Sequence, residues 1–220
     1  MIKWDAIIRS SRKTLCVYVD AFGKITVRAP KHCSDERIFA FLQEKEAWIL
    51  RAVAKAKGAG MRLPPENLDG YSFLLFGRQT EILLTPSKKI VYNRLENNLF
   101  LPAERAREKL VKWLKDTART VLKNVTAQMA EQMGVTYKSV LITSAKTRWG
   151  SCSGKNALHY SFRLLYVTQE LMEYVVVHEL AHTVHKNHSR AFWTLVERYV
   201  PDWRERRKKL KAHSCLMYVF

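Results

Sequence analysis

The sequence predicts an α+β fold in two parts. A β-rich N-terminal region with one helix covers residues 1–101, and residues 102–220 hold a long helix, a small antiparallel sheet and a buried helix. Short β-branched and aromatic runs dominate the first part, and an apolar stripe at helical spacing crosses residues 104–133. Residues 170–185 are apolar at almost every position, as expected of a helix that is buried on all sides.

The N-terminal region is predicted to place strands around its helix. Residues 14–19 and 24–28 favour strands, and residues 20–23 between them suit a hairpin connection because Gly23 accepts positive φ. Ser34 is a suitable N-cap for a helix that gives way at residues 58–60. The elements expected further along are a connector with Pro64 and Pro65, and two strands over 71–76 and 80–84 joined through Gly77.

Pro102 marks the expected boundary between the two regions. A long helix is predicted from Glu104 to about Met133, and Gly134 is placed to stop it. The elements predicted after it are a strand over 137–143, a loop over 147–156 and a long alternating strand over Leu158–Tyr166.

The most unusual bulk property is a formal net charge of +18 at pH 7. Such a field attracts polyanions, so contact with nucleic acid or with phosphate-bearing molecules through the basic surface is left open. A basic run near the C-terminus is interpreted as a solvated helix face, with a phosphate-binding patch as the second interpretation. Its members are Arg204, Arg206, Arg207, Lys208, Lys209 and Lys211.

Cysteine usage and hydropathy favour a cytoplasmic protein. The four cysteines are scattered and form no CxxC pair, which argues against a disulfide scaffold and against a cysteine zinc ribbon. No run has the length and composition of a signal peptide or of a membrane span. We therefore expect no membrane association, and the oligomeric state is left open.

Three polar side chains interrupt the apolar helix predicted over 170–185: His178, Glu179 and His182. Burial penalises such groups unless they are paired or bound to a metal. Residues i and i+4 lie about 6 Å apart along a helix axis, so two imidazoles at this spacing can bind one ion at about 2.0–2.1 Å, the zinc–nitrogen distance. Glu179 leaves the helix about 100° from His178 and can reach a metal-bound water as general base. This is the H-E-x-x-H pattern of zinc peptidases.

A catalytic zinc ion needs a third protein ligand and an open position for water. In an unbroken helix His188 would lie about 15 Å along the axis from His178, so the chain must turn back after His182. Asn187 suits this turn because asparagine accepts the left-handed conformation, and Ser189 can cap a new helix.

On this argument His188 is the favoured third ligand to a single zinc ion. Two further candidates for the third ligand are His185, which is expected near the surface or in contact with a ligand rather than with the ion, and a carboxylate further on such as Glu197. Cys152 is interpreted as a small buried residue, because a cysteine ligand there would close the fourth position and make the site structural.

A family resemblance rests on residues 147–152 (TRWGSC), 174–182 (YVVVHELAH) and 187–193 (NHSRAFW). Together with residues 27–30 and 46–49, these segments make the chain resemble the YgjP-like metallopeptidase family over nearly its whole length. The chain is also similar to the SprT and Wss1 zinc proteases through the spacing of its third histidine.

The resemblance implies a zincin-like catalytic domain over residues 102–220, with Zn²⁺ on His178, His182 and His188 and Glu179 as the base. It also implies that the strand ahead of the active helix, here Leu158–Tyr166, forms one wall of the cleft, where an extended peptide could pair as an added strand.

The predicted function is zinc-dependent hydrolysis of a peptide or protein. Two other functions fit the same residues: a metal-dependent nucleotide phosphohydrolase (pyrophosphatase), and a basic nucleic-acid-binding protein with a structural zinc. The candidates for substrate binding are Arg148, Trp149, Arg163 and Tyr166. The candidates for stabilising the oxyanion are Tyr160, Arg163, Tyr166 and Tyr199.

Overall fold

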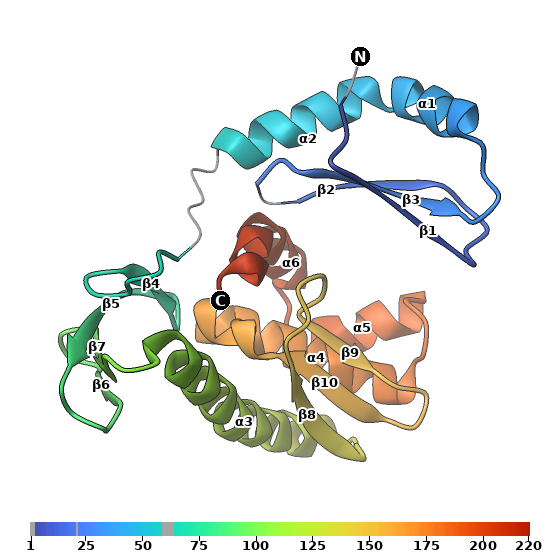
Figure 1. The fold of residues 1–220 in the computed structure, drawn as a ribbon. Helices are drawn as coiled ribbons and strands as arrows, with labels where there is room; N and C mark the ends of the chain where they lie inside the picture. The colour runs from blue at the N-terminus through green and yellow to red at the C-terminus, as the bar shows by residue number, and fades with distance from the viewer. Residues whose placement is uncertain (1–2, 21, 59–63) are drawn as a thin grey trace. The chain divides into compact units, whose positions relative to one another are not determined.

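The computed structural model describes residues 3–20, 22–58 and 64–220. Helices alternate with small sheets, which confirms the α+β class (Figure 1). The chain divides into two compact units, residues 1–62 and 63–220. The division thus falls earlier than the boundary expected at residues 101 and 102.

In the first unit, β1 (Ala6–Ser10), β2 (Cys16–Val19) and β3 (Ile25–Pro30) form a sheet of order β1-β3-β2. The antiparallel pairing of β2 with β3 agrees with the predicted hairpin. The Asp20 side chain accepts hydrogen bonds from the backbone N–H groups of Phe22 and Lys24, and Gly23 has a φ of +79°. Residue 21 of this turn lies outside the described residues. β1, which pairs with β3 in parallel, was not predicted.

Two helices, α1 (Asp35–Glu44) and α2 (Glu46–Gly58), replace the single helix expected in this region. The break falls at Lys45, whose N–H bonds to the carbonyl of Phe41 while its own carbonyl accepts from Ile49. Ser34 caps α1 by accepting from Arg37, as expected. Each helix contributes fully buried residues to the core against the sheet: Ile38 and Leu42 from α1, and Ile49 from α2. The expected connector after Gly58 lies mainly outside the described residues.

The second unit begins with the strands β4 (Ser72–Leu75), β5 (Arg78–Thr85), β6 (Val91–Asn93) and β7 (Asn98–Pro102), in the order β4-β5-β7-β6. Phe76 and Gly77, both at positive φ, form the tight turn between β4 and β5. Phe76 donates its N–H to the carbonyl of Leu165 at 2.6 Å, and the ring of Phe73 packs edge-on against Tyr166. These contacts join the sheet to the C-terminal part of the chain, which is why the boundary lies before it.

α3 (Ala106–Met133) follows the prediction closely. Its buried stripe includes Leu110, Leu114 and Leu122, and the helix ends at Gly134, which has a left-handed φ of +64°. Glycine carries no Cβ penalty in this conformation, and its N–H bonds back to the last turn.

The sheet beside the site contains β8 (Ser139–Thr143), β9 (Gly150–Cys152) and β10 (Ala157–Ser161) in the order β8-β10-β9. It is mixed rather than purely antiparallel, because β10 runs parallel to β8 and antiparallel to β9. The strand expected over Leu158–Tyr166 ends at Ser161, whose hydroxyl accepts from the N–H of Arg163 and starts the 3-10 helix η1 (Phe162–Tyr166).

Three α-helices and a 3-10 helix complete the second unit: α4 (Gln169–Val184), α5 (Arg190–Tyr199), α6 (Trp203–Ala212) and η2 (His213–Tyr218). α4 packs against α3, α5, α6 and β9, which explains why it is apolar around most of its circumference (Figure 1). Among the described residues, no helix combines the length and apolar composition needed to cross a membrane.

Candidate metal centre

The buried helix α4 carries the first two histidines of the site. Its residues Val175, Val176 and Val177 are at most 4% exposed, and Leu180 and Ala181 are fully buried. His178 and His182 are half-buried and lie one turn apart on the same face, with ring centroids 5.0 Å apart. Packing on all sides fixes the helix and therefore fixes both imidazoles.

The chain turns back after α4 and returns His188 to the same face. α4 ends at Val184, and His185 adopts an extended conformation with φ −118° and ψ +107°. The left-handed conformation expected of Asn187 is absent, since this residue is not among the described non-glycine residues with positive φ. Instead, the Asn187 side chain accepts from the N–H of Ser189, whose hydroxyl in turn caps α5 by accepting from Phe192.

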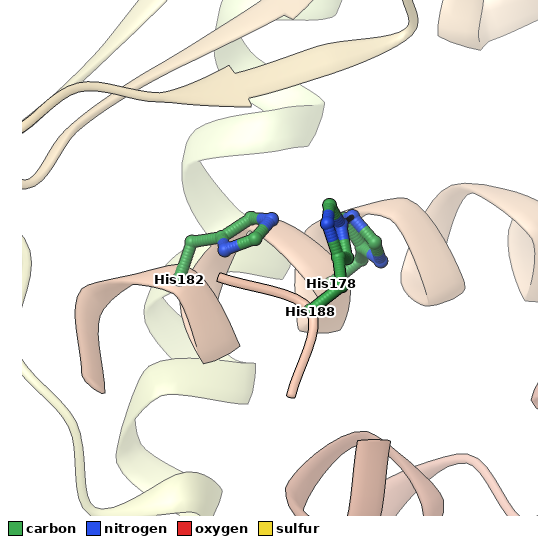
Figure 2. Close-up of side chains that lie close together, drawn as sticks. All are labelled: His178, His182 and His188. Atoms are coloured by element: carbon green, nitrogen blue, oxygen red, sulfur yellow. Dashed lines mark hydrogen bonds between the residues drawn. The ribbon is translucent and has the colours of Figure 1, made fainter. Parts of the chain in front are cut away.

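The turn brings the imidazole of His188 next to those of His178 and His182 on α4 (Figure 2). One ligand nitrogen from each of His178, His182 and His188 lies within 4.8 Å of the others, and the Nε2 atoms of His178 and His188 are 3.2 Å apart. Tetrahedral zinc bonded at about 2.0–2.1 Å separates two ligand nitrogens by roughly 3.3–3.4 Å, which is close to the distance between the His178 and His188 nitrogens.

The protonation of the rings also suits a cation. His182 Nδ1 lies 3.0 Å from the carbonyl oxygen of His185, and because a carbonyl only accepts, this nitrogen carries the proton and leaves Nε2 free as a ligand. Burial, followed by the neighbouring His182 and His188, lowers the pKa of His178 to about 3. The pKa of His188 is also lowered, first by burial and then by His182. Neutral imidazoles are the form that binds metal.

Glu179 lies beside the three histidines and is only 6% exposed. Burial raises the pKa of its carboxyl group to about 8, against the opposing effects of Arg148 and of a hydrogen bond from the Cys152 backbone. A carboxyl group with a raised pKa can both accept and return a proton near neutral pH. Gly150 on β9 makes room for it, because a Cβ atom there would lie 2.8 Å from Glu179 Oε1.

A cavity of about 540 Å³ opens over this group. Of the four residues expected to bind substrate, Trp149 lines this cavity, and both Trp149 and Arg148 line an adjoining cavity of about 210 Å³. The lining of the main cavity comes from β9 and the residue before it, α4, the turn, α5 and α6. Its members are Trp149, Gly150, Tyr174, Val175, His178, Glu179, His188, Trp193, Arg207 and Leu210.

The expectation that Arg163 and Tyr166 bind substrate requires correction. Both are buried, at 2% and 1% exposure, and both hold the C-terminal segment. Arg163 donates to the carbonyls of Ser144, Val219 and Phe220, and the Tyr166 hydroxyl donates to Val219. Both residues lie in the 3-10 helix η1 and not in a strand beside the cavity, and this helix directs their side chains into the core.

The side chains of Glu197, His185 and Cys152 lie outside the group of three histidines. Glu197 forms an ion pair with Arg204 at 2.7 Å. His185 contributes its carbonyl oxygen to His182, and among the described residues neither its ring nor Cys152 belongs to the cluster of candidate metal ligands. Tyr160, expected as a candidate for stabilising the oxyanion, is fully buried.

Sequence reasoning missed three side chains that line the cavity. Tyr174 stands four residues before His178 and so shares its face, a signal that was available in the sequence. Trp193 stacks on His188 with ring centroids 5.6 Å apart. Arg207 was grouped with the solvated basic run, and no local pattern distinguishes it from its neighbours.

The fold and the site together define a metallopeptidase domain, and comparison with known proteins gives the same class. Residues 13–213 match the family model described as YgjP-like, metallopeptidase domain. The chain therefore belongs to the YgjP-like metallopeptidase family, whose membership implies a hydrolase that uses a divalent metal and acts on peptides or proteins.

Two solved structures are also similar. The metallopeptidase zymogen abylysin of Pyrococcus abyssi is 24% identical, with 41% of this chain and 92% of that chain covered and a TM-score of 0.39. The metallopeptidase zymogen jannalysin of Methanocaldococcus jannaschii is 20% identical, with 41% and 94% covered and a TM-score of 0.38. No curated protein matches the chain.

Proposed function

We propose that this protein is a zinc-dependent peptidase in which His178, His182 and His188 hold one Zn²⁺ ion and Glu179 is the general base. The observation that carries the proposal is the convergence of three imidazoles beside a buried carboxyl group. The cluster of candidate ligands formed by the described residues has three members, which leaves a position for water and supports a catalytic rather than a structural ion.

Zinc in this position supplies a Lewis acid and lowers the pKa of water to about 7. Glu179 takes a proton from the attacking water and returns it to the leaving amine. His182 is held in the ligand tautomer by the carbonyl of His185. Tyr174 lines the wall of the cavity and is our candidate for donating a hydrogen bond to the substrate carbonyl.

The edge of the sheet gives the peptide a place to bind. β10 lies between β8 and β9 and has no free edge, so the substrate cannot pair with the strand that was expected to line the cleft. Within the described part of the chain, β9 has β10 on one side only, and its residue Gly150 contacts Glu179. An extended peptide added to β9 would bring its carbonyl groups to the general base.

The test measures zinc content and hydrolysis together for wild type, Glu179→Gln and His188→Ala. Glu179→Gln is expected to bind one zinc ion and to lose turnover of casein and peptides by a factor of about 10³ or more, while His188→Ala is expected to lose the zinc. A Glu179→Gln protein with wild-type turnover overturns the proposal.

The net charge of +18 favours an anionic substrate, so nucleotide hydrolysis on the same site is the second candidate. Assaying the same three proteins against a panel of nucleoside triphosphates separates the two functions. Phosphate release that depends on Glu179, without casein cleavage, identifies a phosphohydrolase. DNA binding that survives Glu179→Gln, without either activity, identifies a binding protein with a structural zinc.

A further inference from the structure

One guanidinium of the basic C-terminal run differs from its neighbours in where it lies. Arg207, on α6, lines the same cavity as His178, Glu179 and His188. Its Cζ atom lies 5.3 Å from the ring centroid of Trp193, and that ring stacks on His188 at 25°. Trp193 also stacks on Trp203 at 4.0 Å, so the aromatic platform that carries the guanidinium is itself fixed.

The neighbouring arginines of α6 have partners within the fold. Arg204 pairs with Glu197 at 2.7 Å, and Arg206 pairs with Asp202 at 2.8 Å and also donates to the carbonyl of Glu170. Across the described parts of the chain, Arg207 has neither a hydrogen bond nor a carboxylate within 4.0 Å. Its stacking on Trp193 satisfies none of its five N–H donors.

Among the described residues that line this cavity, the only carboxyl group belongs to Glu179, which the proposed chemistry already uses. A planar guanidinium matches a carboxylate through two parallel hydrogen bonds. Arg207 is exposed, so its N–H donors can exchange water for such a partner. A cation held against the wall of a peptidase site without an internal partner is therefore suited to a substrate anion.

We propose that Arg207 binds a carboxylate of the substrate, so that this enzyme selects peptides with an acidic side chain or a free C-terminal carboxylate near the scissile bond. The proposal rests on the peptidase function proposed above and specifies its substrate class. Lys208 is the next residue of α6, leaves the helix about 100° further round and does not line the cavity, so it provides a matched control.

The experiment uses the zinc-loaded full chain and a peptide library in which one Glu, or its neutral isostere Gln, occupies each position in turn. A second set of peptides differs only in a C-terminal carboxylate or amide, which distinguishes the two sources of the anion. Wild type is expected to show kcat/KM higher by roughly 10- to 100-fold for the carboxylate member at one position. In Arg207→Gln the ratio of kcat/KM between the carboxylate peptide and its neutral counterpart should fall to near 1, while kcat/KM for the neutral peptide changes little. Lys208→Gln should keep the wild-type ratio.

Arg207→Lys keeps the charge without the planar fork, so it should retain a reduced preference. Zinc stoichiometry and circular dichroism check that each variant is folded. A wild type without carboxylate preference overturns the proposal. So does an Arg207→Gln protein that loses the same factor on neutral and acidic peptides, because that result assigns Arg207 to transition-state stabilisation.

A binding measurement separates this proposal from the peptidase proposal. Fluorescently labelled Glu and Gln peptides are titrated onto zinc-loaded Glu179→Gln protein with Arg207 intact or replaced by Gln. Preference for the Glu peptide that needs Arg207 supports the proposal even if wild type cleaves nothing. Equal binding of both peptides, or Arg207-dependent binding of nucleotides alone, overturns it.

Discussion

Gly150 leaves open the volume that the Glu179 side chain occupies. A Cβ atom at position 150 would lie 2.8 Å from both Cγ and Oε1 of Glu179, closer than carbon atoms tolerate. Because Glu179 sits on the packed helix α4, its side chain rather than its backbone would have to move. The absence of a side chain at Gly150 on β9 is therefore a requirement of the site.

Gly150→Ala should displace the carboxyl group without removing a metal ligand. We expect zinc content to stay at one ion per chain while kcat falls by about 10²-fold, since a displacement of roughly 1 Å from the productive position costs this much. Gly154→Ala, in the turn that follows β9 and with no atom within 4 Å of its added Cβ, is the control and should keep wild-type kcat. Full activity in Gly150→Ala would mean that the position of Glu179 does not matter for turnover.

The raised pKa of Glu179 predicts that the metal-free protein is stabilised by Glu179→Gln. The pKa is about 8 in the folded chain and 4.5 in the unfolded chain, so the folded state holds the proton more tightly. The contribution of Glu179 to stability is then greatest below pH 4.5, falls as the pH rises to about 8, and stays low above it. The neutral glutamine removes this loss, on the order of 1–3 kcal/mol at pH 8.

Urea unfolding in the presence of a chelator, at pH 8 and at pH 4.5, measures this difference. The free energy of unfolding of Glu179→Gln should exceed that of wild type at pH 8, and the two values should be nearly equal at pH 4.5. A gain of equal size at both values would show that packing, rather than ionisation, is the cause.

His188 and His185 should respond differently to truncation. The His188 ring belongs to the cluster of three imidazoles, whereas His185 contributes its backbone carbonyl, which alanine keeps. His188→Ala is expected to weaken zinc binding by more than about 10²-fold, the upper range for loss of a group that only orients a ligand. The zinc affinity of His185→Ala should stay within a few-fold of the wild-type affinity. Competition with a chromophoric chelator measures both, and equal losses would assign a ligand role to the His185 ring.

The parts of the fold that depend on nearby residues could be predicted from the sequence. The face shared by His178 and His182 follows from helix geometry alone, and Gly134 ends α3 for a local reason. The sequence predicted that the chain turns back after His182 and returns His188 to the site, but it did not predict the backbone conformation of that turn. The sequence predicted a left-handed Asn187, whereas the structure uses an extended His185 and a hydrogen bond from the Ser189 N–H to the Asn187 side chain.

Features that depend on distant partners could not be predicted. β1 pairs with β3, twenty residues away, and its sequence carries no strong strand pattern. Arg163 looked like a site residue because it falls within the strand expected ahead of α4, yet its partners are 19 residues before it and 56 and 57 residues after it. Arg207 could not be separated from the charged residues around it until the fold had placed α6 beside the cavity.

Arg163 predicts a structural effect that is distinct from catalysis. Its guanidinium is 2% exposed and donates to Ser144 and Val219 at 3.1 Å each and to Phe220, so one side chain joins η1, the end of the β8 strand and the C-terminal segment. Arg163→Met fills similar space but leaves these carbonyls without donors. We expect a loss of about 2–4 kcal/mol in the free energy of unfolding, measured by urea denaturation with zinc present.

Tyr166→Phe is the matched control for this change. It removes only the longer 3.4 Å hydrogen bond to the same carbonyl of Val219, so its loss should be about 1 kcal/mol or less. Folded Arg163→Met protein should retain its zinc and its KM, because the side chain lies away from the cavity. A change in KM with unaltered stability would return Arg163 to the substrate-binding role that its burial argues against.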